Sequence, residues 1–240
     1  MIGLARYVED ESRPTVRSAL RDLALRVLAP AVALWVAIVG LGALIEGPLG
    51  GLSSENTVNA DLQRGRTPLW DSVTFFWSHI GNTEIVIGVC VVMVAVIWWR
   101  TRQWWVAIVP GIAIAVQATV FVLATAVIGR QRPDVAHLDP APPTSSYPSG
   151  HVGAATALYF TLAALAQRIG NPVLRRVVTA VCLVIPFLVA YARVYRGMHH
   201  VSDVVIGFLN GLVCAALAWV YLRRHPRASA ATAQSGSQPE

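Results

Sequence analysis

Long apolar segments recur along this chain, and they restrict the kind of protein that it can form. A helix needs about 20 mainly apolar residues to cross a bilayer. Six segments approach or meet that requirement, although the second is short: 27–45, 84–99, 104–128, 151–166, 177–192 and 204–222. Charged residues make up only 13% of the chain, whereas they make up about a quarter of a typical soluble domain. The sequence therefore predicts an all-α, polytopic membrane protein with six transmembrane helices in a bundle.

The segment 67–81, TPLWDSVTFFWSHIG, lies between the first two predicted spans and has a different character. Thr67 and Pro68 form a helix-start signal, and the aromatic side chains that follow are mixed with polar ones such as Asp71 and His79. This mixture predicts an amphipathic helix in the membrane interface. We expect a transmembrane domain over 27–222, preceded by a cytoplasmic segment at 1–26 and followed by a disordered cytoplasmic tail at 223–240.

The basic residues are all arginines, and their distribution predicts the orientation in the membrane. If the N-terminus is cytoplasmic, 13 of the 19 arginines fall on the cytoplasmic side and six fall outside. Cytoplasmic loops normally carry the excess of positive charge, so this orientation explains the net charge of +6 without a nucleic-acid partner. The sequence predicts a multi-pass protein of the cell membrane and gives no oligomeric state.

Three polar pieces are expected together on the outer side: GRQRP at 129–133, YPSGH at 147–151 and ARVYRGMHHVSD at 192–203. The guanidinium groups of Arg130, Arg132 and Arg193 are suited to phosphate oxygens. Ser149 and Gly150 open a predicted helix, where free backbone N–H groups and the helix dipole favour an anion. These pieces therefore predict a phosphate-binding site.

Two histidines and an aspartate supply the groups for chemistry at that phosphate. His199 and Asp203 are four residues apart, so on a helix the carboxylate could bond one imidazole nitrogen and leave the other free to attack phosphorus. His151 could protonate the leaving group. The predicted product of the attack is a phosphohistidine, with no metal and no cofactor because arginine supplies the positive charge. A simpler alternative is that Asp203 caps the last helix.

Other polar residues on the outer side have simpler interpretations. We expect Arg64 and Arg66 to be solvated, and Arg196 to contact a lipid headgroup or a loop. The Pro-rich loop carries acidic residues and a histidine at 134, 137 and 139. These positions lack the spacing of metal ligands.

The three pieces resemble the motifs of the membrane-bound type 2 phosphatidic acid phosphatases, also called lipid phosphate phosphatases. That family has Lys, six residues and Arg-Pro; then Pro-Ser-Gly-His; then Ser-Arg, five residues, His, three residues and Asp. Residues 132–133, 148–151, and the positions of Arg193, His199 and Asp203 match. The resemblance covers roughly residues 70–222 and implies a six-helix bundle that dephosphorylates lipids without a metal. Two positions depart from the pattern, Thr125 for the lysine and Ala192 for the serine, and Arg130 could replace the missing cation.

The expected activity is that of a lipid phosphate phosphatase acting from the membrane bilayer at its outer face. Undecaprenyl pyrophosphate is the first choice of substrate, and phosphatidylglycerophosphate and phosphatidic acid are the others. Two alternatives remain. The same site could transfer phosphate to an acceptor other than water, or the chain could be a non-catalytic relative that binds or transports lipids.

Overall fold

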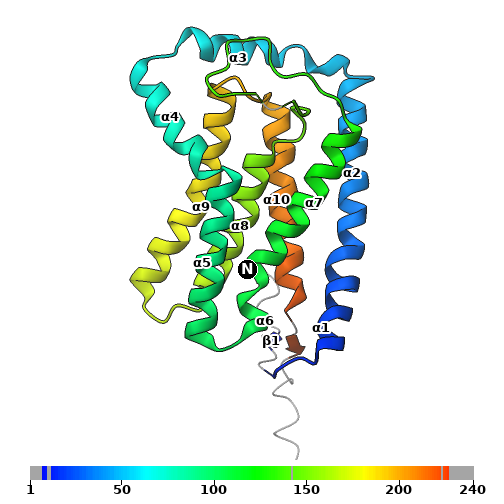
Figure 1. Ribbon diagram of the computed structural model, residues 1–240, viewed down its shortest axis with the longest axis vertical. Coiled ribbons are helices and arrows are strands. Elements are labelled where there is room, and N and C mark those ends of the chain that lie inside the picture. The colour runs from blue at the N-terminus through cyan, green and yellow to red at the C-terminus, as the bar shows by residue number, and fades with distance from the viewer. Residues whose placement is uncertain (1–6, 10–11, 142, 223, 227–240) are drawn as a thin grey trace, which may run out of the picture.

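The computed structural model describes residues 7–9, 12–141, 143–222 and 224–226. Most of the predicted tail at 223–240, and the first residues of the predicted N-terminal segment, lie outside the described residues. The expectation that the tail is disordered falls mainly on those positions. Short strands β1 (Tyr7–Glu9) and β2 (Arg224–Pro226) pair antiparallel at one end of the bundle (Figure 1).

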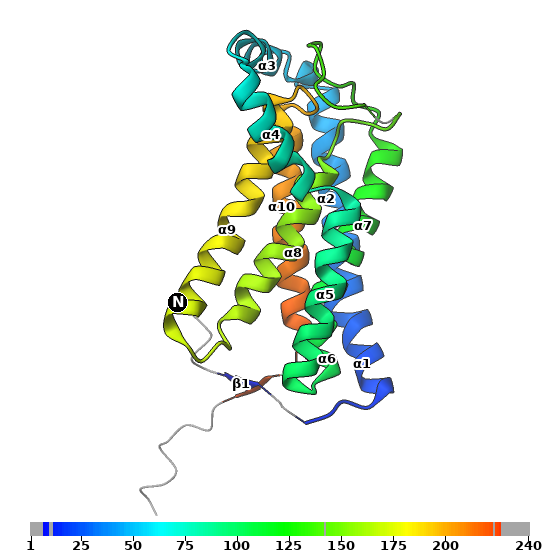
Figure 2. The same ribbon diagram turned by 60° about the vertical axis from the view of Figure 1, so that its left-hand side comes forward.

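The remaining elements are helical, and the long helices run up and down a single bundle (Figure 1). They are α1 (Val16–Leu23), a π-helical turn η2 (Ala24–Leu28), α2 (Ala29–Glu46), a 3₁₀ turn η3 (Gly50–Leu52), α3 (Glu55–Arg64), α4 (Pro68–Ile80), α5 (Thr83–Thr101), α6 (Trp104–Ala107), α7 (Val109–Val127), α8 (Gly150–Ala166), α9 (Pro172–Tyr195) and α10 (Val201–Tyr221). Helix α3 lies across the end of the bundle opposite β1, and α4 runs obliquely from it towards α5 alongside α9 (Figure 1 and Figure 2).

Five helical stretches in the described part of the chain are long and apolar enough to cross a membrane: Val16–Glu46, Thr83–Thr101, Trp104–Val127, Pro172–Tyr195 and Val201–Tyr221. The predicted fourth span, α8, is apolar but has only 17 residues. Twelve of those residues are buried, because α8 packs against α7, α9 and α10 in the middle of the bundle (Figure 2). The prediction of a polytopic membrane bundle built of α-helices is confirmed, and the short β1–β2 pair is an addition at its end.

Glycines allow α8 and α10 to pack at very short range. A side-chain carbon at Gly207 would collide with the carbonyl oxygen of Ser149, and one at Gly211 would collide with the carbonyl oxygen of Gly153. Small residues of this kind let the backbones of membrane helices approach closely. The contact brings the beginning of α8, with His151, next to the beginning of α10.

Two helices were absent from the sequence prediction. The helical stretch that contains the first predicted span begins at Val16, and Thr15 caps it by accepting from the backbone N–H of Ser18 at 3.2 Å. Helix α3 is polar, with no apolar stripe to indicate it. Tertiary contacts stabilise it: Asn59 Nδ2 donates to the carbonyl oxygen of His199 at 3.2 Å, and Glu55 Oε1 accepts from the backbone N–H of Ser202 at 2.8 Å.

Candidate active site

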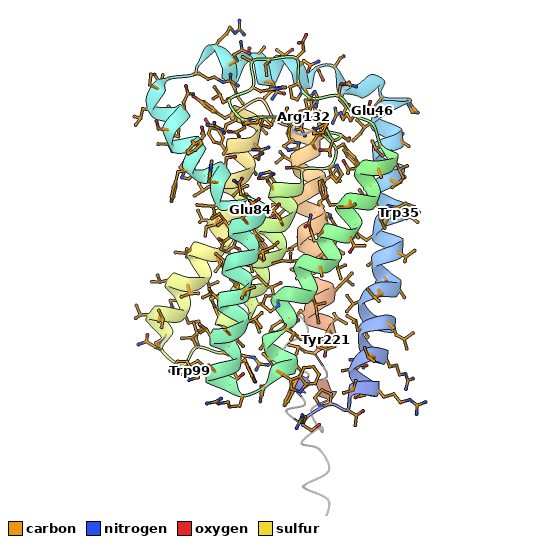
Figure 3. The ribbon with its side chains drawn as sticks, in the orientation of Figure 1. Trp35, Glu46, Glu84, Trp99, Arg132 and Tyr221 are labelled. Carbon is orange, nitrogen blue, oxygen red and sulfur yellow. The ribbon has the colours of Figure 1, made fainter. Side chains whose placement is uncertain are left out.

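A cavity of about 360 Å³ opens near the end of the bundle that α3 and the 128–149 loop cover. Four of the predicted site side chains line it, Arg132, His151, Arg193 and His199, and so does Gly150. Apolar residues of α5 and α7 form the other walls, among them Val86, Ile87, Ile114, Phe121 and Val122. Arg132 lies at this end of the molecule together with Glu46, whereas Trp99 and Tyr221 lie at the other end (Figure 3). The cavity therefore has positively charged arginine side chains in one part of its wall and apolar side chains of α5 and α7 in another.

His199 is buried, and one of its ring nitrogens is already engaged. Nδ1 donates to the carbonyl oxygen of Ser146 at 2.7 Å, so Nε2 carries the lone pair. Burial lowers the pKa of His199 well below its ordinary value of 6.5, and the positive charge of Arg193 lowers it further. The ring is therefore neutral near pH 7, which is the form that can act as a nucleophile.

Asp203 contacts His199 less directly than the four-residue spacing predicted. Its Oδ2 lies 3.9 Å from His199 Nδ1, too far for a hydrogen bond. The carboxylate instead accepts from the backbone N–H of His200 at 2.8 Å and lies 3.0 Å from Ser146 Oγ. It thus caps α10, which was the simpler alternative, and it holds the residue whose carbonyl oxygen accepts from His199.

Each of the two arginines that line the cavity has a hydrogen-bonded Nη1 group and an Nε–H group without a partner in the described residues. Arg193 Nη1 donates to Ser78 Oγ and to Asp139 Oδ2, both at 2.9 Å. Arg132 Nη1 donates to the carbonyl oxygen of Met198 at 2.7 Å. Within the described residues, the buried Nε of each arginine has no hydrogen-bond partner. A buried donor left unpaired is costly, and an anion in the cavity would satisfy both.

Arg130 has a different set of partners. Its side chain is only 2% exposed, and it is not among the residues that line the cavity. The guanidinium pairs with three carboxylates: Asp203 at 2.6 Å, Glu46 at 3.0 Å and Glu55 at 3.1 Å. Thr125, at the position of the family lysine, is not among the lining residues either. The cations that line the cavity are therefore Arg132 and Arg193.

The predicted anion-binding turn at the beginning of α8 is close to the cavity. The backbone N–H of Ser149 donates to the carbonyl oxygen of Asp203 at 2.9 Å, and the buried Ser149 Oγ has no partner within the described residues. A side chain at Gly150 would collide with the ring of Phe121, at 2.8 Å. Glycine at this position therefore lets the ring of Phe121 pack against the beginning of α8 beside the cavity.

Several residues near the site carried no signal in the sequence, because their roles depend on partners far along the chain. His151 Nε2 lies 3.0 Å from Asn82 Oδ1. Asp139 accepts from Arg193 and from Arg196, whose Nη2 lies 2.7 Å from Asp139 Oδ1. Burial alone would raise the pKa of Asp139, but the hydrogen bond and charge of Arg196, together with the charge of Arg193, lower it overall.

The expectation that Arg66 is solvated was wrong. Its Nη2 donates to the carbonyl oxygen of Tyr195 at 2.8 Å, and its Nη1 donates to that of Ala136 at 2.7 Å. These bonds tie the turn between α3 and α4 to the end of α9 and to the loop over the site. Arg64, by contrast, is exposed and pairs only with the nearby Asp61 within the described residues. Arg196, expected to contact a loop or a lipid headgroup, is buried against the loop residue Asp139.

The fold of this chain resembles those of two proteins of known structure. The structure is similar to the crystal structure of the first transmembrane PAP2 type phosphatidylglycerolphosphate phosphatase from Bacillus subtilis, with a TM-score of 0.69 and 26% identity over 79% of this chain and 94% of that one. The fold is also similar to that of Aquifex aeolicus LpxE, with a TM-score of 0.54 and 22% identity over 68% of this chain and 93% of that one. No curated protein matched the sequence. The family model of the PAP2 superfamily matches residues 104–227, which is more than half of the chain, and the chain belongs to that superfamily.

Proposed function

We propose that this protein is an integral-membrane phosphatase that removes phosphate from a lipid through a phosphohistidine intermediate. One observation carries the proposal. A buried, neutral imidazole with a free Nε2 lines the same cavity as two arginines that have unpaired Nε–H groups. Guanidinium groups in a desolvated site stabilise the charge that develops during phosphoryl transfer, so the chemistry needs no metal to supply positive charge.

The reaction follows from the positions of the two histidines. The lone pair on His199 Nε2 attacks phosphorus while Arg132 and Arg193 hold the phosphate oxygens. The P–O bond to the lipid breaks, its electron pair stays on the lipid oxygen, and that oxygen takes a proton from protonated His151. A water molecule then gives a proton back to His151 and its oxygen attacks phosphorus. The P–N bond breaks, its electrons return to His199 Nε2, and inorganic phosphate is released.

The apolar walls support a substrate with a hydrocarbon tail. The walls of the site cavity come from α5 and α7, and a second cavity lies farther along the same two helices, lined by Cys90, Val94, Trp98, Ile112 and Ala115 among others. A tail between these helices would place the headgroup beside the arginines. A hydrocarbon tail of this kind would gain about 0.8 kcal/mol per buried CH₂ group.

We propose undecaprenyl pyrophosphate as the first substrate to examine, as the sequence suggested. The similarity to a phosphatidylglycerolphosphate phosphatase favours phosphatidylglycerolphosphate as the second. The distribution of arginines supports a site on the outer side of the cell membrane, because cytoplasmic loops normally carry the excess of positive charge. Reporter fusions at each end of the chain would test this orientation, because a cytoplasmic location of both ends requires an even number of spans.

A phosphate-release assay tests the proposed function. The purified protein would be given undecaprenyl pyrophosphate, phosphatidylglycerolphosphate and phosphatidic acid in the presence of EDTA. We expect the wild type to release phosphate from at least one lipid and His199→Ala to release none. A thermal unfolding transition like that of the wild type would show that the variant is still folded. Activity that disappears in EDTA would contradict the metal-free mechanism, and normal turnover by His199→Ala would remove His199 from its role.

A further inference from the structure

Asn82 stands at the N-cap of α5, yet its side chain does not cap the helix. An asparagine at an N-cap normally accepts from a backbone N–H of the first turn. Here Asn82 Oδ1 lies 3.0 Å from Nε2 of His151, a residue of α8. The N-cap asparagine of α9 behaves differently: Asn171 Oδ1 accepts from the backbone N–H groups of Val173 and Leu174 at 2.9 and 3.0 Å. The side chain of Asn82 therefore contacts His151 and makes no capping hydrogen bond to its own helix.

The turn before α5 packs closely against α8 and α9. A side-chain carbon at Gly81 would lie 2.7 Å from Val189 Cγ1 and 3.4 Å from His151 Cβ. Only glycine permits this approach without displacing its neighbours. Ser78, four residues before Asn82, accepts from Arg193 Nη1 at 2.9 Å. The junction between α4 and α5 therefore contacts two side chains that line the cavity, His151 of α8 and Arg193 of α9. This junction lies outside the residues matched by the family model.

We infer that Asn82 is a positioning residue that orients His151 for proton transfer to the leaving group. The inference rests on the proposed function. An amide oxygen only accepts hydrogen bonds, so Nε2 of His151 carries a proton and Nδ1 is the nitrogen left for the substrate. For the transfer His151 takes up a second proton, on Nδ1; when the P–O bond of the lipid breaks, that proton passes to the lipid oxygen and the electron pair of the N–H bond stays on Nδ1. The N–H bond at Nε2 and its contact with Asn82 persist throughout.

The first test compares Asn82→Ala with the matched control Asn171→Ala. Both substitutions remove an N-cap asparagine, but only the first removes a contact to His151. We expect Asn82→Ala to lower kcat for a lipid phosphate by about 10- to 100-fold, since a general acid contributes 10²–10⁴-fold, and to leave KM nearly unchanged. Asn82→Asp retains an oxygen acceptor and should recover most of kcat. Asn171→Ala should leave kcat unaltered.

The identity of the leaving group separates positioning from general damage. p-Nitrophenyl phosphate has a leaving group that departs without a proton, so Asn82→Ala should affect its hydrolysis much less than that of a lipid phosphate. In a His151→Ala background, Asn82→Ala should cause no additional loss, because the two residues act as one unit. An equal loss on both substrates, or an additional loss in the double variant, would overturn the inference.

A measurement without turnover keeps this inference separate from the proposed function. Nitrogen NMR of ¹⁵N-histidine-labelled protein, recorded without substrate at a pH where the His151 ring is neutral and with His151→Ala for assignment, should show the Nε2–H tautomer of His151 in the wild type and a mixture in Asn82→Ala. If no lipid is hydrolysed but the tautomer changes as expected, the proposed function fails and the positioning contact stands. An unchanged tautomer in Asn82→Ala contradicts the inference whatever the activity.

Discussion

Arg130 Nη1 lies 2.6 Å from Asp203 Oδ1, and this ion pair is buried, with side-chain exposures of 2% and 0%. The same guanidinium reaches Glu46 at the end of α2 and Glu55 at the start of α3. Arg130 therefore connects three helices at the end of the bundle that holds the site. Its contacts explain why it is not available in the cavity as a replacement for the lysine of the family pattern.

Replacement of Arg130 by methionine should destabilise the protein strongly. Removal of one partner from a buried ion pair costs about 3–5 kcal/mol, because the other charge remains buried and unpaired. We expect a large fall in the thermal transition measured in detergent, together with low activity. A variant with wild-type stability and a raised KM would instead show that Arg130 binds phosphate, as the sequence suggested.

Gly207→Ala should disturb both stability and turnover. The added methyl group would collide with the carbonyl oxygen of Ser149, and overpacking of this kind costs about 1–3 kcal/mol. Because Ser149 precedes Gly150 and His151, we expect kcat to fall as well. Gly88→Ala in α5 is the control, since in the described part of the chain no atom beyond its chain neighbours and its own helix backbone lies within 4 Å of the added carbon. Equal stability and activity of the two variants would contradict the close packing of α8 on α10.

The stability of the protein should fall as the pH decreases below 6.5, and His199 should contribute to the fall. Its folded-state pKa lies well below 6.5 because of burial and the charge of Arg193, whereas in the unfolded chain the ring takes up a proton near pH 6.5. The unfolded state therefore binds more protons, and this one group removes about 1.4 kcal/mol of stability per pH unit below 6.5 until the folded-state pKa is reached.

Thermal transitions between pH 7.5 and 5.0 would measure this contribution. The transition of the wild type should decrease more steeply than that of His199→Gln, whose side chain does not titrate. Parallel curves would mean that His199 is protonated in the folded protein and is not held as a neutral ring.

Vanadate should inhibit phosphate release, because it resembles the transferring phosphoryl group. Arg193→Lys should weaken that inhibition by at least about tenfold, since lysine cannot reproduce the planar fork of arginine that reaches Ser78, Asp139 and the cavity at once. Arg64→Lys is the control, because Arg64 is exposed and contacts Asp61. Inhibition constants from phosphate-release assays would decide between the outcomes, and equal constants for wild type and Arg193→Lys would argue against a role for Arg193 in phosphate binding.

The sequence predicted most of the residues that line the cavity, but not Arg130's absence from it, and some of the contacts differ in detail. His151, Arg132, Arg193 and His199 do line one cavity, and the four-residue step from His199 does place Asp203 nearby. The hydrogen bond that His199 donates, however, goes to the carbonyl oxygen of Ser146, 53 positions away. Nothing in the local spacing could indicate a backbone partner from another segment.

The lengths of the apolar segments and the identities of the motif residues determined the membrane bundle and the candidate chemistry, because both are properties of short stretches of chain. Only the tertiary structure decided which polar atoms are paired. Asn82 and Ser78 became neighbours of the site through the close approach of their turn to α8 and α9, and Arg130 was drawn to three buried carboxylates. A buried charge must find partners wherever packing brings them, and packing joins residues that are far apart in the sequence.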